Sequence, residues 1–206
     1  MFENLRGDIV RVREWSLEEG WWQRRGWSRN IRAILHIGFP AILAYRFGHW
    51  VRGLRIPVVR QILWIIAHIF QRVTTVYSGA FIHPRAEIGP GLVIHSWYGI
   101  LIGATRIGAN CTLSSGVVVD SGTTRIGNNV WLGAGSKVIG PVTIGNDVVI
   151  MPNSLVMADV SDNMTVGGVP ARIKFAGGHP QRFPSLLEKE ENSGAKSQPP
   201  STSVTK

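Results

Sequence analysis

The sequence predicts a mainly β protein: a parallel β-helix that follows an α-helical domain and precedes a disordered tail. From Ile82 to Val156 an aliphatic residue returns about every six residues. Neither helical periodicity nor the alternation of a strand explains this spacing, whereas a hexapeptide repeat is typical of a β-helix built from stacked coils. Residues 1–77 lack the repeat and show helical spacing, and residues 176–206 are rich in Pro, Ser, Lys and Glu.

The first 77 residues predict the α-helical domain. Apolar residues recur at helical spacing within residues 5–12, 31–50 and 58–70. Proline is tolerated in the first turn of a helix and disrupts its interior, so Pro40 and Pro57 should begin or interrupt helices here.

This domain also carries most of the charge. Residues 1–75 contain 12 arginines, no lysine and five acids, which gives 12 − 5 = +7 of the formal charge of +9. Six of the eight tryptophans lie there too. Arginine together with tryptophan indicates one of two uses. The helices form a basic cap that packs on the β-helix or on a second subunit, or they contact an anionic membrane surface. No nucleic-acid motif accompanies the charge, so nucleic acid is not an expected partner.

We expect neither a membrane-spanning segment nor secretion. No segment reaches the roughly 18 uncharged residues of a membrane span, and the N-terminus lacks the layout of a secretory signal. One cysteine, Cys111, fits a reducing compartment. We therefore expect a cytoplasmic protein, with peripheral contact at the inner membrane face as the alternative. The composition of residues 176–206 predicts disorder.

Residues 78–175 predict the β-helix, with repeat positions pointing inward in three columns. Two steps are seven residues long, from Ile94 to Leu101 and from Val119 to Ile126. Small or β-branched residues follow most repeat positions by four, so Cys111, which is one of them, should be a buried small hydrophobe. The repeat positions are Ile82, Ile88, Ile94, Leu101, Ile107, Leu113, Val119, Ile126, Leu132, Val138, Ile144, Ile150 and Val156.

Because aliphatic columns fill such a coil, any site must lie on its outside. His83 and His95 each follow a repeat position, at an outward corner, and the long step after Ile94 should make the corner at His95 bulge. Twelve residues separate the two histidines and no acid or thiol accompanies them, so no metal site is expected. A neutral imidazole can deprotonate a hydroxyl near neutral pH, which makes His95 the candidate general base.

Six stretches carry a family resemblance: Ile82–His95, Tyr98–Gly103, Gly133–Lys137, Gly168–Arg172, Met1–Arg6 and Ala44–Trp50. They are similar to the hexapeptide acyltransferases, and within these to the serine acetyltransferase group. The resemblance covers residues 1 to about 175. It implies a left-handed β-helix, usually assembled as a trimer or a dimer of trimers, that uses acetyl-CoA as acyl donor.

The resemblance also implies roles for individual residues. In that family the histidine matching His95 takes the proton of the acceptor hydroxyl as its oxygen attacks the thioester, without an acyl-enzyme. CoA binds along the groove between neighbouring β-helices. The positions that map to this groove are Gly133, Ala134, Ala171 and Arg172. The further candidates for contact with the acceptor are His83, Trp97 and Tyr98.

The chain departs from the serine acetyltransferases where a serine substrate needs carboxylates. Phe81 replaces an aspartate that orients the catalytic histidine, and Ile94 replaces one directly before it. Two further acid-bearing segments of the family are altered, around residues 15–19 and 120–125. The sequence therefore predicts an O-acetyltransferase whose acceptor is a sugar of an exopolysaccharide or capsule precursor. The alternatives are O-acetylation of L-serine for cysteine biosynthesis and a catalytically silent β-helix that binds a partner.

Overall fold

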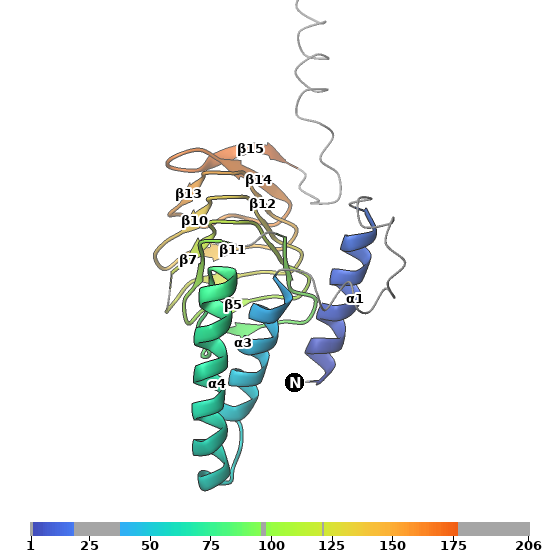
Figure 1. Cartoon of the computed structure of the whole chain (residues 1–206). Helices are drawn as coiled ribbons and strands as arrows, with labels where there is room; N and C mark the ends of the chain where they lie inside the picture. The colour runs from blue at the N-terminus through green and yellow to red at the C-terminus, as the bar shows by residue number, and fades with distance from the viewer. Residues whose placement is uncertain (1, 19–37, 96–97, 121, 177–206) are drawn as a thin grey trace, which may run out of the picture.

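The computed structural model describes residues 2–18, 38–95, 98–120 and 122–176, and it confirms a parallel β-helix preceded by helices (Figure 1). Residues 177–206 of the predicted tail and residues 31–37 of a predicted helix lie outside the described residues. The helices are α1 (Phe2–Glu18), α3 (Phe39–Arg52) and α4 (Pro57–Ser78).

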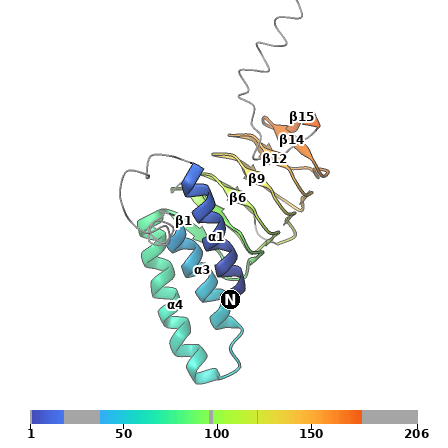
Figure 2. The same ribbon diagram turned by 90° about the vertical axis from the view of Figure 1, so that its right-hand side faces the viewer.

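The helices gather at the end of the β-helix where the first coil begins. Pro40 and Pro57 stand in the first turns of α3 and α4, as predicted. α3 and α4 pack side by side as a hairpin that extends away from the first coil, and α1 lies beside α3 (Figures 1 and 2). Val12 of α1 packs on Val93. α4 leads directly into the first strand, so the hairpin is continuous with the coil.

Each coil contributes short strands to three sheets. The strands of sheet A are β1 (Ala80–Ile82), β4 (Ile100–Ile102), β7 (Val118–Val119), β10 (Lys137–Val138) and β13 (Leu155–Val156). The strands of sheet B are β2 (Glu87–Ile88), β5 (Arg106–Ile107), β8 (Arg125–Ile126) and β11 (Thr143–Ile144). The strands of sheet C are β3 (Val93–Ile94), β6 (Thr112–Leu113), β9 (Trp131–Leu132), β12 (Val149–Ile150), β14 (Met164–Gly167) and β15 (Arg172–Ala176). All neighbours are parallel except β15, which runs antiparallel to β14 at the far end.

The repeat positions form three buried columns, one for each sheet. The sheet A column is Ile82, Ile102, Val119, Val138 and Val156. The sheet B column is Ile88, Ile107, Ile126 and Ile144. The sheet C column is Ile94, Leu113, Leu132, Ile150 and Val166. The small residues between them are also buried, and Cys111 is fully inaccessible as predicted.

One predicted repeat position is wrong. Leu101 is 48% exposed, and Ile102 takes its place in the column, opposite Ile82. Both residues are aliphatic, so spacing alone cannot choose between them, and the hydrogen-bonded register with β1 decides. The step from Ile94 is therefore 102 − 94 = 8 residues. The corner after His95 is longer than predicted.

Side chains of the helices fasten the hairpin to the first coil. The Tyr45 hydroxyl donates to the carbonyl of Ala86 (2.8 Å) and accepts from the N–H of Ile88 (3.2 Å). Arg46 donates to the carbonyl of Ile88 (2.6 Å) and forms a buried ion pair with Asp8 of α1 (2.9 Å). These contacts fix the helices relative to the coil that carries the histidines.

α4 is inverted relative to an ordinary amphipathic helix. Its buried side is small and polar and consists of Ala67, Gln71, Thr74 and Ser78. Its opposite side is a row of aliphatic residues that are 43–87% exposed, here named the α4 stripe: Val58, Val59, Ile62, Ile65, Ile66, Ile69, Val73 and Val76. Such an exposed row marks an interaction surface. Within the described ranges, no helix has the length and apolar character needed to cross a membrane.

Candidate active site

One edge of the β-helix, between sheets C and A, carries His95. Ile94 points into the core, so the next residue turns outward, and the backbone N–H of His95 donates to the following coil (2.8 Å). Ser114, Gly133 and Met151 occupy the same place in successive coils, with the same hydrogen bond. Parallel strands lie about 4.8 Å apart, so two coils separate the backbones of His95 and Gly133 by roughly 10 Å.

The corner that follows His95 has an unusual backbone. Tyr98 has a φ of 95° and is 79% exposed. A positive φ is rare for a bulky residue, and such strain concentrates at functional sites. The N–H of Tyr98 donates to the carbonyl of Ser78 (3.0 Å), and its carbonyl accepts from Gly116 (2.8 Å). The end of α4 and the next coil therefore hold this corner. Trp97, also a candidate, lies outside the described residues.

Positions 81 and 94, where the family has aspartates, carry apolar residues in this chain for different reasons. Ile94 is fully buried, and an added Cβ on Gly38 would lie 2.5 Å from the Cβ of Ile94. A carboxylate at position 94 would point into the core and could not reach an acceptor. Phe81 is half-buried on β1, and its ring packs edge-on against His83 with centroids 6.3 Å apart. Neither position supplies an acid to a substrate.

His83 lies at a different edge, directly after β1, so sheet A separates it from His95. Its Nδ1 accepts the backbone N–H of Arg85 (3.0 Å), which leaves the hydrogen of the neutral ring on Nε2. Burial lowers the pKa of His83, and the charges of Arg85 and Arg52 lower it further. Within one chain the structure does not bring the two histidines together, in agreement with the sequence expectation.

Gly133 and Ala134 lie two coils from His95 on the same edge. An added Cβ at Gly133 would meet the carbonyl oxygen of Ile150 at 2.6 Å, so the stacking of coils requires glycine there. The N–H of Gly133 donates to Ile150 and the carbonyl of Ala134 accepts from Asn153. The N–H of Ala134 has no acceptor among the described residues. That N–H is therefore available as a donor on this edge.

Ala171 and Arg172 lie at the far end of the β-helix. The N–H of Ala171 donates to the carbonyl of Leu155 (2.7 Å), which ties the turn before β15 to the last strand of sheet A. Arg172 begins β15 and is exposed. A ligand that touches both His95 and Arg172 would therefore run along most of the length of the coil.

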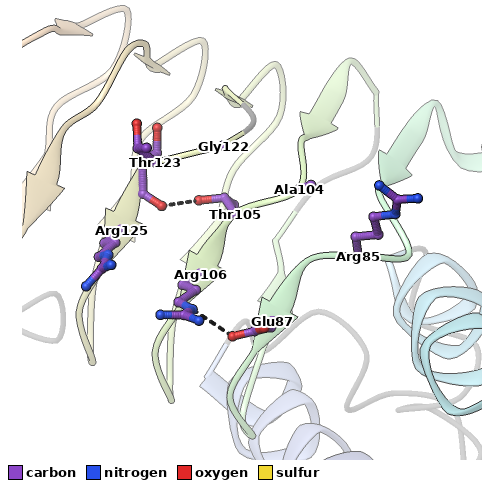
Figure 3. Close-up of a pocket in the computed structure, with 9 residues that line it drawn as sticks. Arg85, Glu87, Ala104, Thr105, Arg106, Gly122, Thr123 and Arg125 are labelled. Atoms are coloured by element: carbon purple, nitrogen blue, oxygen red, sulfur yellow. Dashed lines mark hydrogen bonds and ion pairs between the residues drawn. The ribbon is translucent and has the colours of Figure 1, made fainter. Parts of the chain in front are cut away.

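A separate pocket of about 290 Å³ lies on the edge between sheets A and B (Figure 3). Gly122 and Thr123 form one wall, and Arg106 pairs with Glu87 on another (2.7 Å). The Thr105 hydroxyl donates to the carbonyl of Thr124 (2.6 Å). Of the predicted site residues that the structure describes, none lines this pocket.

Sequence reasoning missed two residues on the His95 edge, Ser114 and Met151. The Ser114 hydroxyl accepts a hydrogen bond from the indole N–H of Trp131 (3.2 Å). Each directly follows a predicted repeat position, Leu113 or Ile150, so counting one residue past the repeat, as for His95, is the signal that identifies them. Elsewhere, burial raises the pKa of the Cys111 thiol to about 11, so it is no nucleophile at neutral pH. The described part of the chain contains no group of three or more His, Cys, Asp or Glu that could hold a metal.

Comparison with known proteins agrees with this architecture. A model of the bacterial transferase hexapeptide (six repeats) matches residues 123–158, and one of the hexapeptide repeat of succinyl-transferase matches residues 99–121. The serine acetyltransferase of Helicobacter pylori strain J99 is 34% identical over 68% of this chain and 82% of that protein. The serine acetyltransferase of Synechococcus elongatus is 36% identical over 73% of this chain, which spans only 63% of that protein.

Solved structures give the same result. The serine acetyltransferase of Brucella abortus aligns with a TM-score of 0.67 and 29% identity, over 86% of this chain and 69% of that one. The same enzyme in complex with coenzyme A aligns with a TM-score of 0.68 and 28% identity, over 86% and 68%. The stacked coils and the matched repeats define a hexapeptide-repeat acyltransferase. Within that class, the chain belongs to the serine acetyltransferase-like family.

Proposed function

We propose that this protein transfers the acetyl group of acetyl-CoA directly to an acceptor hydroxyl, with His95 as the general base. The observation that carries the proposal is the single edge on which His95 and the Gly133–Ala134 turn are aligned. A donor extended along that edge would bring its thioester to the imidazole. The coenzyme A complex of a family member supports the choice of donor. No step of this transfer calls for a metal.

The chemistry requires one proton to move twice. His95 takes the hydroxyl proton as the oxygen attacks the acetyl carbonyl, so the C–O bond forms and the C–S bond breaks. The imidazolium then returns the proton to the leaving thiolate of CoA. A positioned general base contributes about 10²–10⁴-fold to such a step. Arg172 is suited to a phosphate of CoA, because guanidinium groups bind phosphate through paired hydrogen bonds.

The comparisons favour L-serine over the sugar acceptor that the sequence predicted. The relatives named above are serine acetyltransferases, and nothing among them supports an exopolysaccharide or capsule precursor. We therefore propose L-serine as the acceptor. A sugar hydroxyl is the second candidate, because a neutral acceptor needs no carboxylate partner, and Phe81 and Ile94 supply none.

The test is CoA release by purified protein with L-serine and with a panel of sugars, for the wild type and His95→Ala. We expect kcat/KM to fall by about 10²–10⁴-fold in His95→Ala, with acetyl-CoA binding retained. Turnover of sugars alone would replace serine with the second candidate. Wild-type protein that binds acetyl-CoA but turns over no acceptor would contradict the enzyme and favour the silent scaffold.

We further propose that the chain assembles as a trimer through the α4 stripe. Six stripe residues alternate steps of three and four along α4, as in a coiled-coil seam: Val59, Ile62, Ile66, Ile69, Val73 and Val76. All six are β-branched, and isoleucine at both seam positions shifts the preference from two helices to three or four. Contact with an anionic membrane surface is the competing use of this stripe.

A further inference from the structure

Between the helical hairpin and the first coil lies a pocket of about 200 Å³ that the proposed reaction does not use. Three elements form it: Arg52 from the end of α3, Gln71 from the buried side of α4, and the turn His83–Arg85 after β1. Gln71 lies on the opposite side of α4 from the α4 stripe, so this pocket and the proposed subunit contact are separate features.

The polar groups around this pocket include several hydrogen-bond donors. The side chains of Arg52 and Arg85 form no ion pair with any described residue. His83 uses Nδ1 to accept the N–H of Arg85, so its Nε2 carries the hydrogen. Gln71 is 7% exposed, and its amide nitrogen has no hydrogen-bond partner among the described residues. A buried donor without an acceptor is costly, and a bound acceptor would remove that cost.

Among the residues that the structure describes, no acid pairs with the two arginines. Residues 38–86 contain neither Asp nor Glu, and the carboxylate of Glu87 is engaged by Arg106 at 2.7 Å. The lowered pKa of His83, caused first by burial and then by the two arginines, agrees with a positive potential in the pocket. A ligand with several acceptor oxygens and negative charge is the chemical complement of these groups.

The cationic surface continues along α4 beyond this pocket. A second depression of about 250 Å³ is lined by Arg52, Arg60, Gln61 and Trp64, so the two depressions share Arg52 and Trp64. The ring of Trp64 stacks on His68, with centroids 4.2 Å apart. This aromatic pair forms a wall between the two depressions, each of which could hold an anion.

We propose that the pocket between α3, α4 and the His83–Arg85 turn binds a phosphate group, carried as a mono- or diester. Tetrahedral phosphate offers acceptor oxygens in several directions, which suits donors that arrive from three elements. The aromatic wall would contact the carbon part of the ester. A water-soluble phosphorylated molecule and the headgroup of an anionic lipid share this chemistry.

Calorimetric titration with inorganic phosphate tests the site. We expect Arg52→Met and Arg85→Met each to weaken phosphate binding by roughly tenfold or more, because hydrogen bonds to charged groups are lost. Arg72→Met is the matched control, since Arg72 is an exposed arginine of α4 outside both depressions, and it should leave the affinity unchanged.

Gln71→Leu separates a ligand site from a purely structural role. It removes a buried donor that lacks a partner, so the thermal stability of the free protein should stay equal or rise while phosphate binding weakens. Phosphate affinity that is the same in Arg72→Met and in the double variant of Arg52 and Arg85 would overturn the proposal. So would Gln71→Leu protein that is less stable and binds phosphate as tightly as the wild type.

Vesicle sedimentation distinguishes the two sources of phosphate. Vesicles of phosphatidylcholine with and without phosphatidylglycerol are compared, for the wild type and the double variant of Arg52 and Arg85. Binding that requires phosphatidylglycerol and both arginines, and that inorganic phosphate competes away, supports a lipid headgroup. Phosphate binding without vesicle binding supports a soluble phosphorylated ligand. Vesicle binding that is unchanged in the double variant, together with no phosphate binding, overturns the site.

Discussion

A shift of one residue decides whether a side chain of this coil faces the core or the solvent. Ile94 lies in the sheet C column with no exposed surface, and His95 directly after it turns outward. Leu101 and Ile102 divide in the same way, with Ile102 inside. Chemistry can therefore lie only on alternate positions and at corners. Cys111 occupies an inward position, which makes its thiol a structural group.

Cys111 should make the stability of the fold depend on pH above about 9. Burial raises the pKa of its thiol from 9.0 to about 11. A raised folded pKa contributes stability that is full below the unfolded pKa and is lost as pH rises through the folded one. Between pH 9.0 and about 11, the free energy of unfolding of the wild type should fall by about 2 kcal/mol more than that of Cys111→Ala. Urea unfolding across this range measures the difference, and parallel curves would contradict it.

At the scale of elements, α4 is the helix whose apolar side is left exposed in the single chain. The side that faces its own chain is small and polar, with Thr74 and Ser78 among its residues, and the aliphatic residues of the α4 stripe face outward. Fully burying an aliphatic side chain is worth about 1.5–3 kcal/mol, so eight exposed ones represent a large gain on association. The apolar row is as wide as the face of an ordinary core helix and wider than a two-stranded seam. This width favours a bundle of several helices.

Ile66→Asp should break the proposed trimer. A charge in the middle of the seam cannot be buried without a partner, so the mass in solution should fall from three times 22.7 kDa toward a single chain. Gln61→Asp places the same charge on an exposed position of α4 outside the α4 stripe and should keep the trimer. Light scattering after size-exclusion chromatography gives the mass.

Two results would contradict assembly through the α4 stripe. One is a wild type that is already monomeric. The other is a trimer that Ile66→Asp leaves intact. A monomer that sediments with phosphatidylglycerol vesicles, and loses this binding in Ile66→Asp, would assign the stripe to the membrane surface instead.

At the scale of the whole molecule, the repeat made the β-helix predictable because each inward position is decided locally, every six residues. The sequence also identified the three helices that the structure describes, since their spacing and prolines are local signals. The contacts between these parts are not local. Arg46 contacts Asp8 across 38 positions of sequence, and Gly38 packs against Ile94. A repeat or helical spacing in the sequence does not indicate such distant pairs. The phosphate pocket was missed for the same reason.

The ion pair of Asp8 and Arg46 joins the three parts of the molecule. Asp8 belongs to α1 and Arg46 to α3, and their side chains are 0% and 4% exposed. Asp8 also accepts the backbone N–H of Leu92 in the first coil (2.8 Å), and Arg46 donates to the carbonyls of Ile88 and Gly89, both at 2.6 Å. The pair therefore sets how α1 and the hairpin sit on the coil that carries His95.

Asp8→Ala should destabilise the protein by about 3–5 kcal/mol, because it leaves the Arg46 guanidinium buried without its anion. The control is Glu87→Ala, which breaks the exposed pair with Arg106, whose side chains are 60% and 61% accessible. That change should cost at most about 1 kcal/mol. Urea unfolding measures both, and hydrogen exchange should show that the amide of Leu92 loses protection only in Asp8→Ala. Equal, small losses in the two variants would mean that the buried pair does not hold the helices to the coil.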